Sequence, residues 1–308
     1  MRTGLRLVAV VAAAAACLTG TAEAACVASD ITGITYTSTS LAPYNPFTST
    51  SSKLVTVTVS TTRACPVELA FLTPSTPARM SGPDVLAYDV QSSAGATSLL
   101  YLGGTPSSTA HIDIGAGNMG TATVQISVPA GQVVPDGAYS DGSLVAHVFD
   151  KADSTFTLLK TAAMPVTGSV AKVCEFTAPT SPTLNFTSAI ANGRPNPGYV
   201  QSLTFNGVSC TAPTIVRLSG NAMQPRQPAG ASPGFDSQIH YRANARFNAA
   251  SAVLDTSVAS EASSATRNTT AGATGNGSIS VDVNLLAGNP LLAGTYAATL
   301  TVAIDPSP

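Results

Sequence analysis

The chain has 308 residues with 14 basic and 16 acidic side chains, so its formal net charge is −2. Charged residues make up only 10% of it, whereas Ser and Thr together number 73 and Trp is absent. So few basic residues exclude a typical nucleic-acid-binding protein, the 44% hydrophobic content excludes typical intrinsic disorder, and the scarcity of helix-favouring Glu, Lys, Gln and Arg argues against a helical fold.

The first 24 residues have the pattern of a secretory signal peptide. Two arginines precede an apolar run over residues 7–18, and Ala22-Glu23-Ala24 forms a small-residue cleavage motif. The run is shorter than the ~20 residues that a membrane span needs. We therefore expect cleavage between Ala24 and Ala25 and an exported mature chain.

Four cysteines remain in this mature chain, an even number that favours disulfide bonds in an exported protein. Cys26 and Cys65 are 39 positions apart, and Cys174 and Cys210 are 36 positions apart. Four cysteines allow three pairings, and the similar spacing in the two halves favours Cys26–Cys65 and Cys174–Cys210. A metal site is disfavoured because no Cys-x-x-Cys motif occurs and the three histidines are distant from every cysteine in the sequence.

Alternation of apolar and polar residues predicts half-buried β-strands along the mature chain. The clearest examples cover residues 54–59, 121–128, 279–285 and 296–304. Turn-forming pairs are frequent, and three of them are Asn192-Gly193, Asn206-Gly207 and Asn276-Gly277. Short alternating strands with regular turns predict an all-β chain of β-sandwiches.

A second repeated feature follows the cysteines in each half. Gly137-Ala138-Tyr139 and Gly294-Thr295-Tyr296 both precede a final alternating strand. Each half therefore has the order cysteine, cysteine, Gly-x-Tyr, strand. We interpret the mature chain as two tandem domains, residues 25–167 and 168–308, each of ordinary single-domain size.

The sequence contains no pattern that indicates a catalytic, cofactor or metal site. Residues 115–120 match Gly-x-Gly-x-x-Gly, but the residues after them alternate like a strand, whereas a dinucleotide site requires a helix there. We interpret this segment as a glycine-rich turn. Neither Gly-x-Ser-x-Gly nor His-Glu-x-x-His occurs. We therefore expect neither enzymatic activity nor a bound cofactor.

In the C-terminal half, Cys174 and Cys210 occur together with a pattern of hydrophobic and turn residues over residues 217–223, 235–243, 254–256 and 290–296. Through these residues the C-terminal half resembles the spore coat protein U-like domain, which occurs in subunits of archaic chaperone–usher pili. The N-terminal half resembles this domain more loosely, through residues 44–47, 79–80, 86–88 and 129–132.

The resemblance implies immunoglobulin-like β-sandwiches of the pilin type, in which one strand is missing and part of the core is exposed. A periplasmic chaperone fills such a gap first, and a donor strand from the neighbouring pilin subunit fills it afterwards. An outer-membrane usher is the further partner that the resemblance implies. It also implies passage through the periplasm and a final location at the cell surface, in a pilus or fimbrium.

The two ends of the sequence indicate a place in such a pilus. Cys26 is expected to be the second residue of the mature chain, which leaves no donor strand before it. The second domain ends soon after its Gly-x-Tyr strand and is expected to be incomplete, whereas residues 156–162 are suited to complete the first domain in cis. These features favour a tip adhesin. The alternatives are an exported coat component or minor pilin without an adhesive role, and a secreted enzyme or carbohydrate-binding module.

Candidate surface-binding loops lie in the first domain. They contain Tyr44 and Phe47 and, farther along the chain, Leu99, Leu100 and Tyr101. Apolar loops on a protein of low charge favour hydrophobic attachment to a host or abiotic surface. The alternative is that these residues belong to strands and face the core.

Overall fold

The regular secondary structure of the described residues is almost entirely β-strand. The computed structural model describes residues 25–48, 50–93, 97–151, 155–176, 181–227, 232–264 and 273–307. Within these segments the helices are two three-residue 3-10 turns, η1 (Ala28–Asp30) and η2 (Thr187–Ala189), and no helix is long and apolar enough to cross a membrane. The all-β prediction is therefore confirmed. The expected signal peptide, residues 1–24, lies outside the described segments.

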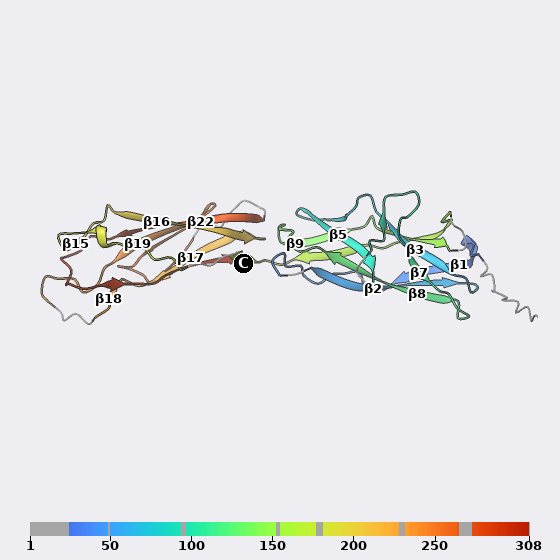
Figure 1. Ribbon diagram of the computed structural model, residues 1–308, viewed down its shortest axis with the longest axis horizontal. Coiled ribbons are helices and arrows are strands. Elements are labelled where there is room, and N and C mark those ends of the chain that lie inside the picture. The colour runs from blue at the N-terminus through green and yellow to red at the C-terminus, as the bar shows by residue number, and fades with distance from the viewer. Residues whose placement is uncertain are drawn as a thin grey trace, which may run out of the picture.

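The first twelve strands form the N-terminal sandwich, which Figure 1 shows at one end of an elongated molecule. Their bounds are β1 (Ile31–Tyr36), β2 (Ser51–Thr61), β3 (Val67–Leu72), β4 (Ala78–Ser81), β5 (Val85–Ser92), β6 (Leu100–Tyr101), β7 (Ala110–Ile112), β8 (Met119–Val128), β9 (Gly137–Asp141), β10 (Val145–Asp150), β11 (Leu158–Ala163) and β12 (Val166–Val170). One sheet has the order β1-β2-β8-β5-β4-β9-β12, and the other has the order β11-β10-β3-β6 with β7 beside β3.

The two sheets of the N-terminal sandwich enclose one hydrophobic core. β2 and β8 bury every second residue, as the alternation predicted, and their Val57 and Val124 pack in the same cluster as Leu69 and Val148 of the opposite sheet. The intervening outward positions are mostly Thr and Ser. The high content of these two residues is therefore explained by strands that are buried on one face only.

The remaining strands form the C-terminal sandwich, which has its own core. Their bounds are β13 (Cys174–Phe176), β14 (Ile190–Ala191), β15 (Arg194–Pro195), β16 (Val200–Cys210), β17 (Thr214–Gly220), β18 (Gln224–Pro225), β19 (Tyr241–Phe247), β20 (Ala250–Asp255), β21 (Glu261–Ser263), β22 (Thr274–Leu285), β23 (Tyr296–Ala297) and β24 (Leu300–Pro306). The main sheet has the order β13-β16-β22-β19-β20 and faces β21-β17-β24, while β14-β15 and β18-β23 are short separate pairs.

β12 spans the expected domain boundary between residues 167 and 168. It pairs with β9, and its Val166 and Val170 belong to the N-terminal core. β13, which pairs with β16, is the first strand of the C-terminal sandwich. Residues 171–173 therefore connect the two sandwiches.

The Gly-x-Tyr repeat forms the same contact in both sandwiches. The Tyr139 hydroxyl donates to the Pro135 carbonyl at 2.7 Å, and the Tyr296 hydroxyl donates to the Leu292 carbonyl at 2.9 Å. Each tyrosine thus bonds to the backbone four residues upstream, like the tyrosine corner of immunoglobulin sandwiches. The next strands, β10 and β24, pair with β3 and β17 respectively. β10 and β24 are therefore corresponding strands of the repeat.

Both predicted disulfides are present. Cys26 is bonded to Cys65, and Cys174 is bonded to Cys210, with sequence separations of 39 and 36. The second bond joins directly paired residues of β13 and β16. In the chain-entropy model, closing a loop of this length stabilises the folded state by about 4 kcal/mol.

Two of the three Asn-Gly pairs that were expected to form turns lie inside strands. Asn192-Gly193 does form the β14–β15 turn, with φ of 52° and 74°. Asn206-Gly207, however, lies within β16, where the register with β22 shifts between Asn206 and Val208. Asn276-Gly277 lies within β22. Gly207 has φ 78°, a value that a bulge accommodates without ending the strand.

Two buried side-chain hydroxyls lack a hydrogen-bond partner among the described residues, and both are in the C-terminal sandwich: those of Thr214 and Tyr241. The Tyr241 hydroxyl lies against Gly220, where a Cβ atom would collide with it. Burial raises the pKa of Tyr241. By contrast, the buried Tyr88 hydroxyl of the N-terminal sandwich donates to the Asp141 carboxylate at 2.6 Å.

These two tyrosines should respond oppositely to loss of the hydroxyl. Tyr241→Phe should raise the free energy of unfolding by about 1 kcal/mol, because it removes a desolvated hydroxyl that has no partner. Tyr88→Phe should lower it by about 1–3 kcal/mol, because Asp141 loses a donor in a buried position. Urea denaturation of the wild type and both variants measures the two effects. A destabilised Tyr241→Phe variant would contradict the expectation.

Candidate functional site

The β10 strand of the N-terminal sandwich is paired along both edges. β3 lies on one side and β11 on the other. β11 covers most of residues 156–162, so the expected completion of this sandwich in cis is confirmed. The Tyr36 hydroxyl donates to the Ala163 carbonyl at 3.0 Å and thereby links β1, at the edge of the opposite sheet, to the end of β11. This side of the N-terminal sandwich is therefore closed.

The corresponding strand β24 is paired along one edge only, with β17, as far as the described residues extend. Its inward side chains Leu300, Val302 and Ile304 pack against the C-terminal core but remain partly exposed. Phe176 of β13 and Phe205 of β16 are also partly buried, and their ring centroids are 6.4 Å apart. We call β24 together with these two phenylalanines the open edge.

The open edge combines two properties that favour strand addition. One side of β24 presents backbone N–H and C=O groups that no strand of the described segments pairs with, and such an unpaired edge is the usual template for pairing with another chain. The half-exposed apolar side chains would gain burial if a further strand covered them. An extended peptide with alternating apolar side chains satisfies both requirements, through main-chain bonds and side-chain packing respectively.

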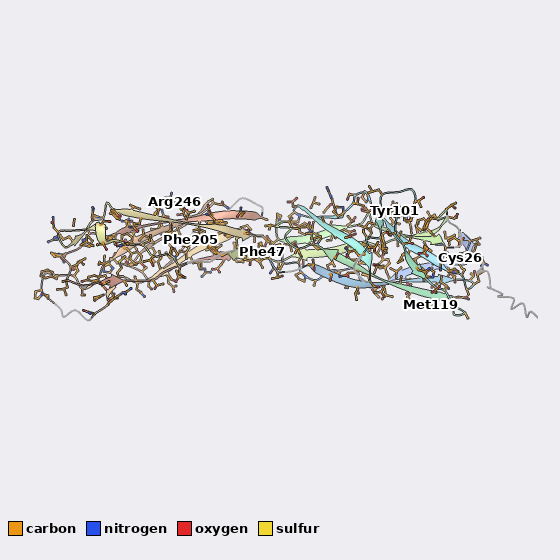
Figure 2. All side chains as sticks on the ribbon, in the orientation of Figure 1. Cys26, Phe47, Tyr101, Met119, Phe205 and Arg246 are labelled. Atoms are coloured by element: carbon orange, nitrogen blue, oxygen red, sulfur yellow. A yellow bond between two sulfur atoms is a disulfide. The ribbon has the colours of Figure 1, made fainter. Side chains whose placement is uncertain are left out.

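The N-terminal sandwich carries exposed apolar side chains at the end remote from the C-terminal sandwich. Val27, Met119 and Leu158 are 52%, 59% and 46% exposed. Figure 2 shows Met119 at this end of the molecule, together with Cys26, the residue that precedes Val27. We call Val27, Met119 and Leu158 the far-end patch.

Hydrogen bonds and strand pairing connect the segments of the far-end patch. The Cys26 N–H donates to the Asp150 carboxylate at 3.0 Å, which places Val27 beside the end of β10. The Asp150 N–H donates to the carbonyl of Thr157, the residue before Leu158, at 3.0 Å. On the other side, the Thr62 N–H donates to the Asp30 carbonyl at 2.8 Å, and the adjacent β2 pairs with the start of β8 at Met119.

The candidate loop residues from the sequence lie elsewhere. Tyr44 is 1% exposed, and its hydroxyl donates to the Pro129 carbonyl at 2.8 Å. Phe47 is half-buried and lies at the end of the N-terminal sandwich that faces the C-terminal sandwich (Figure 2). Leu99, Leu100 and Tyr101 are buried on or next to β6, which pairs with β3. None of the four buried residues therefore forms an exposed apolar loop.

No sequence pattern predicts the far-end patch in the way that alternation of apolar and polar residues predicts a strand. Its three members come from segments far apart in the chain, and each is a single apolar residue at the start or end of a local element. Isolated exposed apolar residues are common on protein surfaces. Only the fold, which brings the three segments to one end, distinguishes this group.

An aromatic cluster lies on the outer face of the β11-β10-β3-β6 sheet. The Tyr101 hydroxyl is hydrogen-bonded to Nδ1 of His147, and Phe149 packs near both rings. Phe156 covers Phe149, with ring centroids 6.0 Å apart. His147 is largely buried, and this burial lowers the pKa of its imidazole.

The buried imidazole predicts a pH-dependent stability of the N-terminal sandwich. Because its pKa is lower in the folded than in the unfolded state, the unfolded chain binds more protons below a pH of about 6.5. Stability should therefore fall as the pH drops from about 6.5 through the folded-state pKa. His147→Asn, which retains an acceptor, should flatten this part of the curve. Thermal unfolding between pH 8 and pH 4 measures it, and identical curves for both proteins would contradict the assignment.

A group of polar side chains surrounds His111 on the surface of the N-terminal sandwich. His111 contacts Glu68 at 3.0 Å through Nδ1, and Asp113 and the Lys151 ammonium at 2.7 and 3.0 Å through Nε2. Both ring nitrogens thus have charged neighbours. A polar depression of about 290 Å³ beside β17 and β24 is lined by Ser, Thr, Asn, Gly and Glu261, a set without a histidine or cysteine. Within the described segments, no group of three or more His, Cys, Asp or Glu residues is arranged to hold a metal ion.

Comparison with known proteins gives no match to a protein-family model and no match to a curated protein. Among solved structures, a chain of the CsuC–CsuE chaperone–tip adhesion subunit complex from archaic chaperone–usher Csu pili of Acinetobacter baumannii is 14% identical, with 89% of this chain and 100% of that chain covered and a TM-score of 0.37. The CupB6 tip adhesin from Pseudomonas aeruginosa is 9% identical, with 89% and 95% covered and a TM-score of 0.34. CfaE, the adhesive subunit of CFA/I fimbria of enterotoxigenic Escherichia coli, is 12% identical, with 78% and 82% covered and a TM-score of 0.30.

Proposed function

We propose that the protein is the adhesive tip subunit of a chaperone–usher pilus. The observation that carries this proposal is the difference between two corresponding strands. β10 is covered on its second edge by β11 of the same chain, whereas β24 is paired with β17 alone among the described residues. The N-terminal sandwich thus supplies its own last strand, and the C-terminal sandwich is suited to accept one from another polypeptide.

The partners follow from this open edge and from the resemblance of the C-terminal half to the spore coat protein U-like domain. A periplasmic chaperone covers β24 during export, an outer-membrane usher receives the complex, and a neighbouring pilin subunit then supplies the permanent donor strand. Two disulfides support an exported protein, because such bonds persist in oxidising compartments. Removal of residues 1–24 as a signal peptide belongs to the same proposal.

The N-terminal sandwich is the adhesive domain, comprising residues up to β12, and the C-terminal sandwich is the pilin domain. The far-end patch lies at the exposed end of the adhesive domain, opposite the pilin domain, and presents three apolar side chains to solvent. We infer that this patch attaches to hydrophobic host or abiotic surfaces without enzymatic activity. The patch favours an adhesive role over that of a coat component or minor pilin, for which no such surface is required.

Hydrogen–deuterium exchange tests strand acceptance directly. The probes are synthetic peptides that copy the N-terminal segments of pilin subunits encoded beside this gene, here called neighbour-pilin peptides. Binding should slow exchange of the β24 amides and leave the β10 amides unchanged, because β11 already covers β10. If neither a neighbour-pilin peptide nor the co-expressed chaperone protects β24, the proposal is wrong. Retention of the purified protein on polystyrene and on hydrophilic glass tests the adhesive role separately.

A further inference from the structure

Thr211 links the C-terminal sandwich to the connecting segment. It follows β16 directly after Cys210 and is fully buried. Its N–H donates to the Val173 carbonyl at 2.9 Å, and its Oγ1 accepts the Val173 N–H at 2.9 Å. The same hydroxyl donates to the Ala171 carbonyl at 2.6 Å. One threonine therefore fixes two of the three residues that connect the sandwiches.

The N-terminal sandwich holds the same junction from its own side. The Asp136 N–H, just before β9, donates to the Thr211 carbonyl at 2.8 Å. The Ala171 N–H donates to the Tyr44 carbonyl at 2.9 Å. Ala171 is thus bonded to one sandwich through its N–H and to the other through its carbonyl. Because these groups are paired, the connection lacks the free rotation of a flexible linker.

The open edge ends at this junction. The residues that follow Thr211 lead into β17, whose first residue, Thr214, pairs with Pro306 at the end of β24. The Pro213 carbonyl accepts the Ser307 N–H at 2.6 Å. Figure 1 shows the C-terminal end of the chain between the two sandwiches. β13, which carries Phe176 of the open edge, begins directly after Val173.

We propose that Thr211 is a positioning residue that fixes the orientation of the adhesive domain relative to the open edge, and that a strand added along β24 tightens this junction. The first part stands on the hydrogen bonds alone, while the second rests on the proposed function. A donor strand orders β24 up to Pro306 and packs against β13, and both segments are connected through Pro213 and Val173 to Thr211. Binding that orders one side of a shared contact reduces the entropic cost of ordering the other side.

Residual dipolar couplings test the positioning role. In the wild type, amides of both sandwiches should fit one alignment tensor. Thr211→Val removes only the hydroxyl and should require two different tensors, whereas Thr211→Ser should restore the single tensor. Thr204→Val is the matched control, because Thr204 is an outward-facing residue of the same strand, and it should behave as the wild type. A single tensor in a folded Thr211→Val variant would overturn the positioning role.

The exchange rate of the Asp136 amide in the wild type is a second test of the positioning role, and it does not require any variant to fold. In the wild type this amide should exchange at least tenfold more slowly than in a free peptide, because it is bonded to Thr211. Exchange at the rate of the free peptide overturns the positioning role even if Thr211→Val fails to fold. Saturation with a neighbour-pilin peptide should slow the exchange at Asp136 several-fold further.

The experiment with the neighbour-pilin peptide distinguishes the proposed function from the coupling, by which we mean the tightening of the junction when a strand is added along β24. If a peptide protects β24 but leaves exchange at Asp136 and the alignment unchanged, the coupling is overturned and strand acceptance stands. If no peptide or chaperone protects β24, strand acceptance fails and the coupling fails with it, whereas the positioning role of Thr211 is still decided by the alignment of the two sandwiches.

Discussion

Replacing Val302 with aspartate should abolish strand uptake at the open edge. Val302 pairs with the buried Leu218 and faces the C-terminal core, yet it remains partly exposed. An incoming strand would cover the new carboxylate and remove it from water, and its cross-strand partner on β17, Leu218, is apolar. Burial of an unpaired charge costs several kcal/mol, and about 3 kcal/mol already corresponds to more than a hundredfold in affinity. Titration with a neighbour-pilin peptide by isothermal calorimetry measures this loss.

The control for this substitution is one position away on the same strand. Thr301 pairs with Ser219 and is exposed on the outward face of β24. Thr301→Asp introduces the same charge at the same edge, but an added strand leaves it in water, so affinity should change less than threefold. Val302→Thr, which keeps the shape, should weaken binding modestly and guards against misfolding of the aspartate variant. Equal affinity of the Val302→Asp and Thr301→Asp variants would show that strand uptake does not involve the inward face of β24.

The sequence predicted those parts of the fold that depend on local alternation and covalent spacing. The strands at residues 54–59 and 121–128 alternate because one face is buried, and their burial pattern is confirmed in β2 and β8. The two disulfides were also predicted, from their similar spacing in the two halves. The Gly-x-Tyr repeat was predicted to precede a strand in each half, as it precedes β10 and β24, whereas the bond from each tyrosine hydroxyl to the backbone was not predicted. The pairing of β10 with β11 was also predictable, because β11 is the next strand in the chain and the two form a local hairpin.

The Asn-Gly pairs show where local signals are ambiguous. At Asn192-Gly193 the positive φ angles close a hairpin, but Gly207 uses the same freedom for a bulge inside β16. The dipeptide specifies backbone angles, whereas strand continuation depends on whether β22 offers partners on both sides of the bulge. That information is non-local and cannot be read from the pair itself.

The loop candidates were ambiguous for a related reason. Leu99, Leu100 and Tyr101 form a short apolar run between polar segments, which is consistent with an exposed loop or a buried edge strand. The pairing of β6 with β3 buries the run, with Leu99 and Leu100 in the core and Tyr101 in the aromatic cluster on the outer face of the sheet. Tyr44 is likewise buried, because its hydroxyl meets the Pro129 carbonyl and the Gln132 N–H in the adjacent loop. The sequence thus identified apolar segments correctly but not the surface that remains apolar after folding.

Substituting the far-end patch should remove most adhesion to a hydrophobic surface. In the combined variant Val27→Ser, Met119→Ser and Leu158→Ser, the fold should be retained because all three side chains are about half exposed. Burying an apolar side chain completely is worth roughly 1.5–3 kcal/mol, so covering three half-exposed ones against a surface contributes about 3 kcal/mol. Adhesion strength should therefore fall about a hundredfold. Quartz-crystal microbalance binding to polystyrene measures it on the purified protein.

A matched variant distinguishes this surface from general hydrophobicity. Leu54, Val85 and Val253 are 60%, 45% and 52% exposed but lie away from the far end. Changing these three to serine removes similar apolar area, yet adhesion should stay within twofold of the wild type, because these three residues do not lie at the outer end of the adhesive domain, where the far-end patch is presented. Equal losses in both variants would mean that attachment is not confined to the far end. Unchanged adhesion of the far-end variant would place the adhesive surface elsewhere. Neither result bears on strand uptake at β24, because the far-end patch belongs to the adhesive domain and the open edge belongs to the pilin domain.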